Sequence, residues 1–294
     1  MFTAASLVAL SLMGNSTLNA PAEHAAARAA EPNYASIMAD RAPSLALIKF
    51  ILSFDGGGGQ SQDVEGEAMA VLIDPKGLLV MSGTEIGQRK GMSANVKELK
   101  VCIGDDTEGV LAKLVGRDSE LDLAWLRIEK PSDKGYTVID PAKSAVPKVG
   151  DTIVGLDKMG KYFDRTPVVF TTMVGGITKK PRELFIPSPG ASLQTFFIGT
   201  PFFNAAGEFV GMSVIQMPNA DSEEGMNSRS RERLTRFDQG FKILPAAEIV
   251  SATARAVEAE KSGKGVGMEE PKPEEKKEEP ATTEPKKDEP MKKD

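Results

Sequence analysis

Short apolar runs separated by turn residues fill the middle of this sequence, between residues 42 and 258. The clearest turn is Asp-Pro-Lys-Gly at residues 74–77, where proline and glycine stand at positions that β-turns favour. It joins residues 68–73 and 78–81 as a hairpin. Many short strands with frequent turns favour closed barrels or a sandwich over a fold of alternating strands and helices. We therefore expect an all-β fold.

Further strands are expected along this whole region. They cover residues 45–52, 99–103, 109–115, 122–128, 152–156, 168–174, 196–203 and 208–215. After Pro245 the sequence is rich in alanine, glutamate and valine at the 3.6-residue spacing of a helix, over residues 246–259. The expected body of the protein therefore spans residues 41–260 and ends in a short helix.

The two ends of the chain differ from this body. Residues 4–13 are apolar and a run of small residues follows at 25–30, which is typical of a signal peptide. No Lys or Arg precedes the apolar run, so a disordered alanine-rich arm is the alternative for this leader, residues 1–40. Residues 261–294 mix Pro, Glu and Lys with almost no apolar side chains. We expect a disordered tail there, because such a segment buries too little surface to offset its chain entropy.

Composition excludes several functional classes. The formal net charge is −6 and no basic stripe with aromatic residues is present, so nucleic-acid binding is not expected. The longest apolar run is far shorter than the roughly 20 residues of a membrane-spanning helix. Cys102 is the only cysteine and His24 the only histidine, which leaves no internal disulfide and no zinc site of Cys and His ligands. We expect no metal and no cofactor.

Three segments carry an ordered set of motifs. Residues 68–84 run through Asp-Pro-x-Gly to Thr84. Residues 115–126 have the sequence Val-Gly-Arg-Asp-Ser-Glu-Leu-Asp-Leu-Ala-Trp-Leu, and residues 197–202 have the sequence Phe-Ile-Gly-Thr-Pro-Phe, ahead of an Asn-Ala-Ala-Gly turn. In this order the segments resemble the trypsin-like serine proteases of the PA clan, and within them the Htr/Deg type. The resemblance extends over roughly residues 43–250.

The resemblance implies a fold and the positions of a catalytic triad. The fold is a trypsin-like double six-stranded antiparallel β-barrel with a short C-terminal helix, with barrel 1 at about residues 43–140 and barrel 2 at about residues 145–245. Thr84 falls at the position of the family's histidine, Asp122 at its aspartate and Ile198 at its serine. Phe197, Ile198 and Gly199 occupy the loop that forms the oxyanion hole in the family.

These replacements conflict with the family's chemistry. In the family a serine hydroxyl attacks the peptide bond, an imidazole moves the proton and a buried carboxylate orients the imidazole. A hydroxyl at position 84 is no base near neutral pH, and a hydrocarbon at position 198 is no nucleophile. Bulky side chains also occupy Phe197 and Ile198, where the oxyanion loop of the family has glycine and small residues. We therefore expect a pseudoprotease and no enzyme, with no active catalytic residue.

The expected function is binding of a protein or an extended peptide in the cleft between the barrels, by strand addition, in a secreted or periplasmic compartment. Two alternatives stay open. One is a serine endopeptidase-like hydrolase with displaced residues, in which Ser82, Ser192 or Thr200 acts with a lysine, or Asp122 serves different chemistry. The other is a structural envelope protein that works through its charged tail. The sequence assigns neither a partner nor an oligomeric state.

Overall fold

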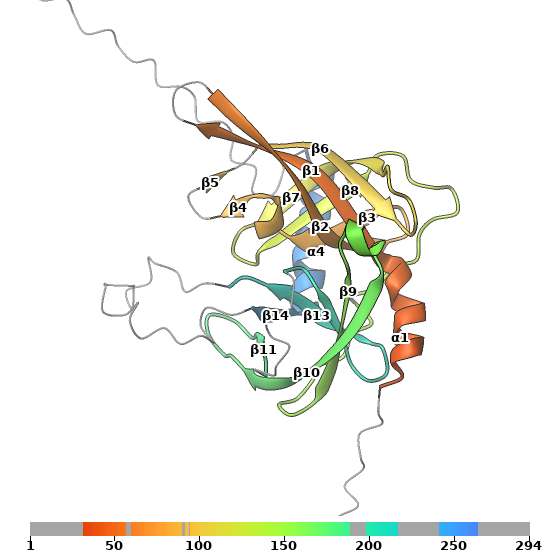
Figure 1. Cartoon of the computed structure of the whole chain (residues 1–294). Coiled ribbons are helices and arrows are strands. Elements are labelled where there is room, and N and C mark those ends of the chain that lie inside the picture. The colour runs from red at the N-terminus through yellow and green to blue at the C-terminus, as the bar shows by residue number, and fades with distance from the viewer. Residues whose placement is uncertain are drawn as a thin grey trace, which may run out of the picture.

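Two closed barrels of six antiparallel strands each make up the body of the protein, stacked one on the other as Figure 1 shows. The structure is a computed structural model, and it describes residues 32–56, 60–89, 92–93, 95–188, 198–216 and 241–263. This architecture confirms the expected fold class, a double β-barrel with a C-terminal helix.

Barrel 1 closes in the strand order β1-β2-β3-β8-β7-β6. Its strands are β1 (Leu45–Gly56), β2 (Gln60–Asp74), β3 (Leu78–Ser82), β6 (Asn95–Ile103), β7 (Val110–Asp118) and β8 (Leu123–Ile128). The β2–β3 turn is the predicted one: Asp74 accepts a hydrogen bond from the Lys76 amide at 2.6 Å, and Gly77 takes a left-handed φ of 82°. A small separate hairpin, β4 (Gln88–Arg89) and β5 (Met92–Ser93), lies outside the barrel sheet.

Barrel 2 closes in the order β10-β11-β14-β13-β12-β9. Its strands are β9 (Thr152–Lys158), β10 (Pro167–Ile177), β11 (Phe185–Pro187), β12 (Pro201–Phe203), β13 (Phe209–Val214) and β14 (Lys242–Pro245). Three single helical turns occur among the described residues: η2 (Ala42–Ser44) joins α1 to β1, η3 (Thr84–Ile86) follows β3, and η4 (Lys161–Phe163) lies between β9 and β10.

Alternating side chains of the same strands build three separate cores. On β2, Ala70 and Leu72 point into barrel 1, whereas Val71 points to the opposite side. The cluster on that opposite side also contains Leu156 and Val214 of barrel 2, so it is the apolar interface between the barrels. Two-sided burial explains why these strands are nearly continuous apolar runs in the sequence.

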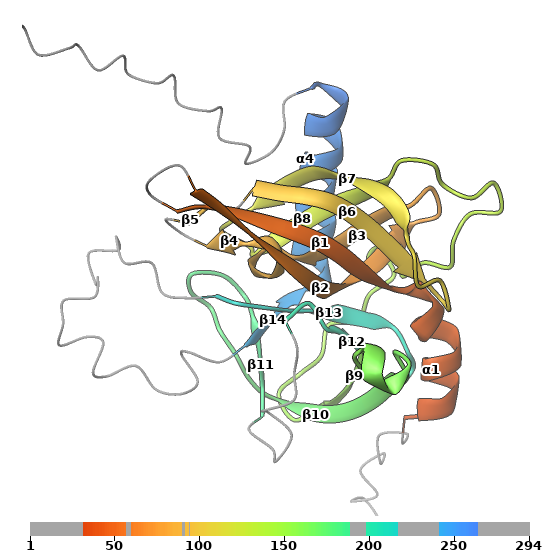
Figure 2. The same ribbon diagram turned by 45° about the horizontal axis from the view of Figure 1, so that its top comes forward.

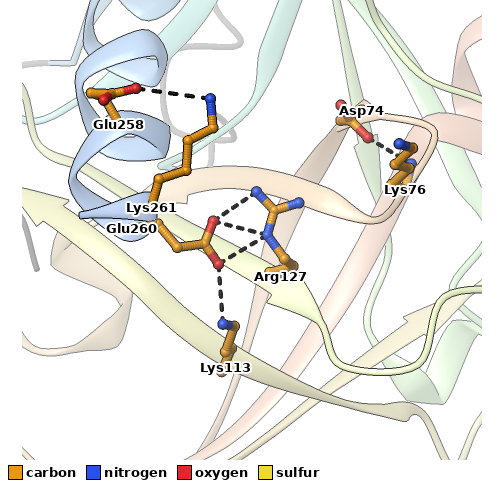
Figure 3. Close-up of polar contacts among 7 residues, drawn as sticks. All are labelled: Asp74, Lys76, Lys113, Arg127, Glu258, Glu260 and Lys261. Carbon is orange, nitrogen blue, oxygen red and sulfur yellow. Dashed lines mark hydrogen bonds and ion pairs between the residues drawn. The ribbon is translucent and has the colours of Figure 1, made fainter. Parts of the chain in front are cut away.

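The C-terminal helix α4 (Ala246–Lys261) leaves barrel 2 and packs on barrel 1. Trp125 of β8 donates a hydrogen bond from Nε1 to Thr253 Oγ1 at 2.9 Å. Near the end of the helix, the Glu260 carboxylate accepts hydrogen bonds from Arg127 Nε, which is shared between its two oxygens, and from Arg127 Nη2, and it lies 3.1 Å from Lys113 Nζ (Figure 3). Figure 2 shows the helix running along barrel 1. It therefore ties the two barrels together.

The N-terminal helix α1 (Tyr34–Arg41) is an addition to the predicted elements. It lies within residues 1–40, which the sequence analysis assigned to a leader. Asn33 caps the helix by accepting a hydrogen bond from the Ser36 amide at 3.1 Å, and Arg41 Nε donates to the Gly207 carbonyl of barrel 2 at 3.0 Å. Ile37 is the buried apolar side chain on the inner face of this helix. A single apolar position is too weak a pattern to predict a helix from the sequence.

Several strands differ in extent from their predicted ranges. Strand β2 begins at Gln60 rather than at residue 68, and the predicted strand at residues 196–203 is reduced to β12 in the described part of the chain. Strands β11 and β14 were not predicted, since each is only three or four residues long. The predicted signal peptide and the charged tail lie almost entirely outside the described residues. No helix among the described residues is long and apolar enough to cross a membrane.

Candidate functional site

A buried carboxylate, Asp122, lies at the centre of the candidate site. It belongs to the turn between β7 and β8, takes a left-handed φ of 56°, and is 5% exposed. Its Oδ1 accepts hydrogen bonds from the amide and the hydroxyl of Thr84 at 2.7 and 2.8 Å. Its Oδ2 accepts from Ser82 Oγ at 2.7 Å and from the Ile215 amide at 2.8 Å. All four hydrogen-bonding positions of the carboxylate are therefore occupied.

The surroundings of Asp122 act on its protonation in opposite directions. Burial raises the pKa of the carboxyl above its ordinary value, because a charged group loses its hydration there. The four hydrogen bonds favour the charged form and oppose this effect. Burial is the larger cause, so the proton is held more tightly than in water.

The donors to Asp122 come from both barrels. Ser82 ends β3 and Thr84 begins η3, both in barrel 1, whereas Ile215 directly follows β13 of barrel 2. The Gly83 amide also donates to the main-chain carbonyl of Asp122 at 3.0 Å. Asp122 therefore fixes the end of β13 beside the segment that carries Thr84. Sequence analysis placed Thr84 and Asp122 in one site, and they are in direct contact.

Ile198 lies in the same region. A Cβ on its neighbour Gly199 would come within 3.4 Å of the Met69 carbonyl oxygen and 3.6 Å of the Ser82 nitrogen. Gly199 has a left-handed φ of 86°, which an isoleucine or phenylalanine would not adopt without strain. The segment with Ile198 thus passes next to Ser82, a direct partner of Asp122. Phe197, the first residue of the predicted oxyanion loop, lies outside the described residues.

A second buried carboxylate, Asp157, contacts the segment of residues 198–200. Asp157 lies on β9, and its Oδ2 accepts a hydrogen bond from Thr200 Oγ1 at 3.0 Å, while its Oδ1 accepts from the Lys158 amide at 2.7 Å. Burial raises the pKa of Asp157 to about 6, against these hydrogen bonds. The Thr200 amide in turn donates to Ser213 Oγ at 2.9 Å. Asp157 and Ser213 therefore anchor the residues that follow Ile198.

Sequence reasoning missed two of these groups. Nothing marks Ser82 as a partner of Asp122 in the sequence except its place two residues before Thr84. Asp157 and Thr200 are 43 positions apart, and although Thr200 lies in the segment Phe-Ile-Gly-Thr-Pro-Phe, nothing in the sequence pairs it with Asp157. Of the hydroxyl groups named for a displaced mechanism, those of Ser82 and Thr200 are buried and donate hydrogen bonds to the Asp122 and Asp157 carboxylates, whereas Ser192 lies outside the described residues.

Metal ligands are the remaining possibility for such a site. Within the described ranges, no group of three or more His, Cys, Asp and Glu side chains could hold a metal ion. The only histidine, His24, precedes the described part of the chain. The chemistry available at the site therefore comes from hydroxyl groups, carboxylates and main-chain amides.

Comparisons with known proteins agree with this geometry. A model of the trypsin-like peptidase domain family matches residues 68–212. A probable periplasmic serine endoprotease, DegP-like, of Rickettsia prowazekii is 28% identical over 151 residues, which are 48% of this chain and 26% of that protein. A serine protease Do-like HtrA of Bacillus subtilis is 31% identical over 134 residues, 42% of this chain and 29% of that protein. The chain spans less than a third of the length of either relative.

These comparisons correct one expectation from the sequence. The curated relatives are named serine endoprotease and serine protease, which points to protease activity, so the expectation of no enzyme is wrong on this finding. That expectation rested on the side chains at Thr84 and Ile198 and on the bulky residues of the predicted oxyanion loop, Phe197 and Ile198. A missing imidazole at one position excludes one mechanism, but it does not exclude a nucleophile and a base drawn from other groups.

The order of motifs, the two closed barrels, and the contact of Thr84 with Asp122 beside the segment of Ile198 agree with the family match. Residues 68–212 of this chain therefore match the trypsin-like peptidase domain, and over this region the chain is similar to DegP-like and HtrA serine proteases.

Proposed function

We propose that this protein recognises an extended polypeptide at the site between its two barrels. The observation that carries the proposal is the hydrogen bond from the Ile215 amide to Asp122, which fixes the end of β13 beside positions 84 and 198. Beyond Val214 no strand pairing is found among the described residues. The Ile215 amide is held by Asp122, so an added strand would use the remaining main-chain groups of residues 215–216. The side-chain Oε1 of Gln216 is buried there without a hydrogen-bond partner in the described structure.

The names of the relatives support the same function. Serine endoproteases act on polypeptides, and two of the relatives are named periplasmic. We therefore place the proposed binding outside the cytoplasm, in the periplasm or in a secreted protein.

Photocrosslinking tests this proposal directly. The photoreactive residue p-benzoylphenylalanine replaces Ile198, which is half-buried in the site, or Val146, which is 74% exposed outside it. Each full-length variant is irradiated with an unfolded polypeptide such as casein. We expect crosslinked product from position 198 and far less from position 146. Equal crosslinking from both positions would contradict polypeptide recognition at this site.

Hydrolysis of peptide bonds is the second candidate function, and the relatives' names favour it. Ser82, Thr84 and Thr200 are the described hydroxyl groups found on buried carboxylates, and Thr84 is the one of them with partial exposure. A buried carboxylate with a raised pKa is a better proton acceptor than an ordinary one. The hydrolysis that the described residues allow therefore uses Thr84 Oγ1 with Asp122 as its base.

A degradation assay on fluorescent casein separates these outcomes. Thr84→Val keeps the shape of the side chain and removes its hydroxyl, so it should abolish hydrolysis by this mechanism while crosslinking at position 198 persists. Hydrolysis that persists in Thr84→Val would mean that a group other than the Thr84 hydroxyl is the nucleophile. Absence of hydrolysis in the unaltered protein would reject this second candidate and leave the first intact.

A further inference from the structure

Strand β2 carries a long edge that pairs with no other strand in the described structure. It pairs with β1 along its whole length, from Gln60 to Val71. Its ladder with β3 involves only Val71, Leu72 and Asp74. Over residues 61–67, the main-chain groups of every second residue therefore point away from β1 toward an edge that has no partner strand among the described residues.

The outer half of this edge projects from barrel 1. The hairpin of β1 and β2 extends beyond the body of the barrel in Figures 1 and 2. Along residues 61–67 every side chain position is exposed except Gly66, which is intermediate. Neither a helix nor a proline covers or interrupts this stretch among the described residues. Such an edge is a template for strand addition.

The two faces of this strand differ in character. Asp63, Glu65 and Glu67 share one face, because side chains alternate along a strand. Val64, which is 43% exposed, lies on the other face. A strand added here therefore has carboxylates beside one of its faces and an apolar side chain beside the other.

Cations of the protein neutralise only part of the acidic face. Lys97 of β6 lies 3.2 Å from Asp63, and the pKa of Asp63 is lowered first by a hydrogen bond from the Ser53 side chain and then by Lys97. Arg165, in the β9–β10 loop, lies 3.2 Å from Glu67. Glu65 lies between these two pairs and has no cationic partner among the described residues. The central carboxylate of the row is therefore the one available to a partner.

We propose that the free edge of β2 over residues 61–67 binds a second polypeptide as an added β-strand, with lysine or arginine beside Glu65 and an apolar residue beside Val64. Main-chain hydrogen bonds supply the affinity, and the two adjacent side chains select a segment in which basic and apolar residues alternate. This surface lies outside the candidate site and adds an interaction to the proposed function.

A fluorescein-labelled heptapeptide of alternating lysine and valine tests the proposal by fluorescence anisotropy on the full-length protein. Two further peptides carry N-methyl groups on all lysines or on all valines. An added strand uses the amides of alternate residues only, so one methylated peptide should lose binding and the other should keep it. A peptide with glutamate in place of lysine should bind poorly.

A matched pair of variants tests the role of charge. Glu65→Lys should weaken binding of the lysine-valine peptide by about 3- to 10-fold, as expected for a few exposed ion pairs. Glu129→Lys changes an exposed carboxylate near the β2–β3 turn and should leave the Kd unchanged. Ile198→Asp alters the site between the barrels and should also leave the Kd of the lysine-valine peptide unchanged. A failure of the proposed function at that site can therefore be told apart from a failure of this inference.

Three results would each overturn the inference. Both N-methylated peptides could bind like the parent peptide, which excludes an added strand. Glu65→Lys could behave like Glu129→Lys, which excludes recognition of the cation at this position. The glutamate peptide could bind as tightly as the lysine peptide, which excludes the predicted charge preference.

Discussion

Replacing Asp157 by asparagine should make this protein more stable at neutral pH. The carboxyl is 4% exposed, and burial raises its pKa from 3.8 to about 6. An asparagine has nearly the same shape and carries no charge to desolvate. Its carbonyl can accept the hydrogen bond from the Lys158 amide, and the Thr200 hydroxyl can rotate to accept one from its amide group.

The size and direction of the effect follow from linkage. The folded protein binds the Asp157 proton about two pH units more tightly than the unfolded chain, which corresponds to about 3 kcal/mol. This stabilisation is fully present below about pH 4 and is lost as the pH rises to about 6, where the folded state must hold a buried charge. The asparagine variant does not lose it. At pH 8 the variant should therefore exceed the unaltered protein by about 1 to 3 kcal/mol, after allowing for imperfect hydrogen bonds.

Urea unfolding at half-unit steps from pH 4 to pH 8 measures this difference. Asp133→Asn, at an exposed turn, is the matched control and should give a difference near zero at every pH. For Asp157→Asn the free energy difference should rise between about pH 4 and pH 6 and then level off. A difference that is independent of pH, or that favours the unaltered protein at pH 8, would refute the reasoning.

Three further changes have defined outcomes. Glu260→Ala removes the bidentate ion pair shown in Figure 3 and should lower the free energy of unfolding by about 1 kcal/mol, less at high salt. Thr253→Val leaves the buried indole N–H of Trp125 without an acceptor and should cost about 1 to 3 kcal/mol in the same urea assay. The double variant Thr84→His with Ile198→Ser puts an imidazole against the central carboxylate and a hydroxyl nearby. It should increase labelling at position 198 by a fluorophosphonate probe, and labelling no greater than in the unaltered protein would contradict the assignment of these positions.

The barrels could be predicted because their strands are buried on two sides and therefore appear as apolar runs between turns. The turn at residues 74–77 and the strands beside it are examples. The outer half of β2 could not be predicted in this way. Between Ser61 and Glu67 both faces of the strand are exposed to solvent, so no alternation of apolar and polar residues marks it. Its pairing with β1 holds it extended, and that is a tertiary effect.

The site was predictable only in part, and for a related reason. Asp122 lies in a motif of twelve residues, 115–126, that could be recognised in the sequence. The position of Thr84 could be inferred from the turn at residues 74–77 that precedes it. Ser82 and Ile215 donate to the same carboxylate, but their roles depend on the approach of separate strands. The expectation of no enzyme went wrong because it was drawn from the side chains at positions 84, 197 and 198, whereas the relatives are named serine proteases.

The saturation of Asp122 constrains every function considered for the site. Because both of its oxygens already accept two hydrogen bonds, a bound polypeptide cannot add another without displacing a donor. Releasing Ser82 or the Ile215 amide would leave a buried charge less solvated, which costs more than an ordinary hydrogen bond, and releasing the Ile215 amide would also loosen barrel 2 from barrel 1. Thr84 is different, since it gives two hydrogen bonds to one oxygen and is partly exposed. Its hydroxyl is therefore the group that can turn toward a polypeptide while its amide keeps the carboxylate in place.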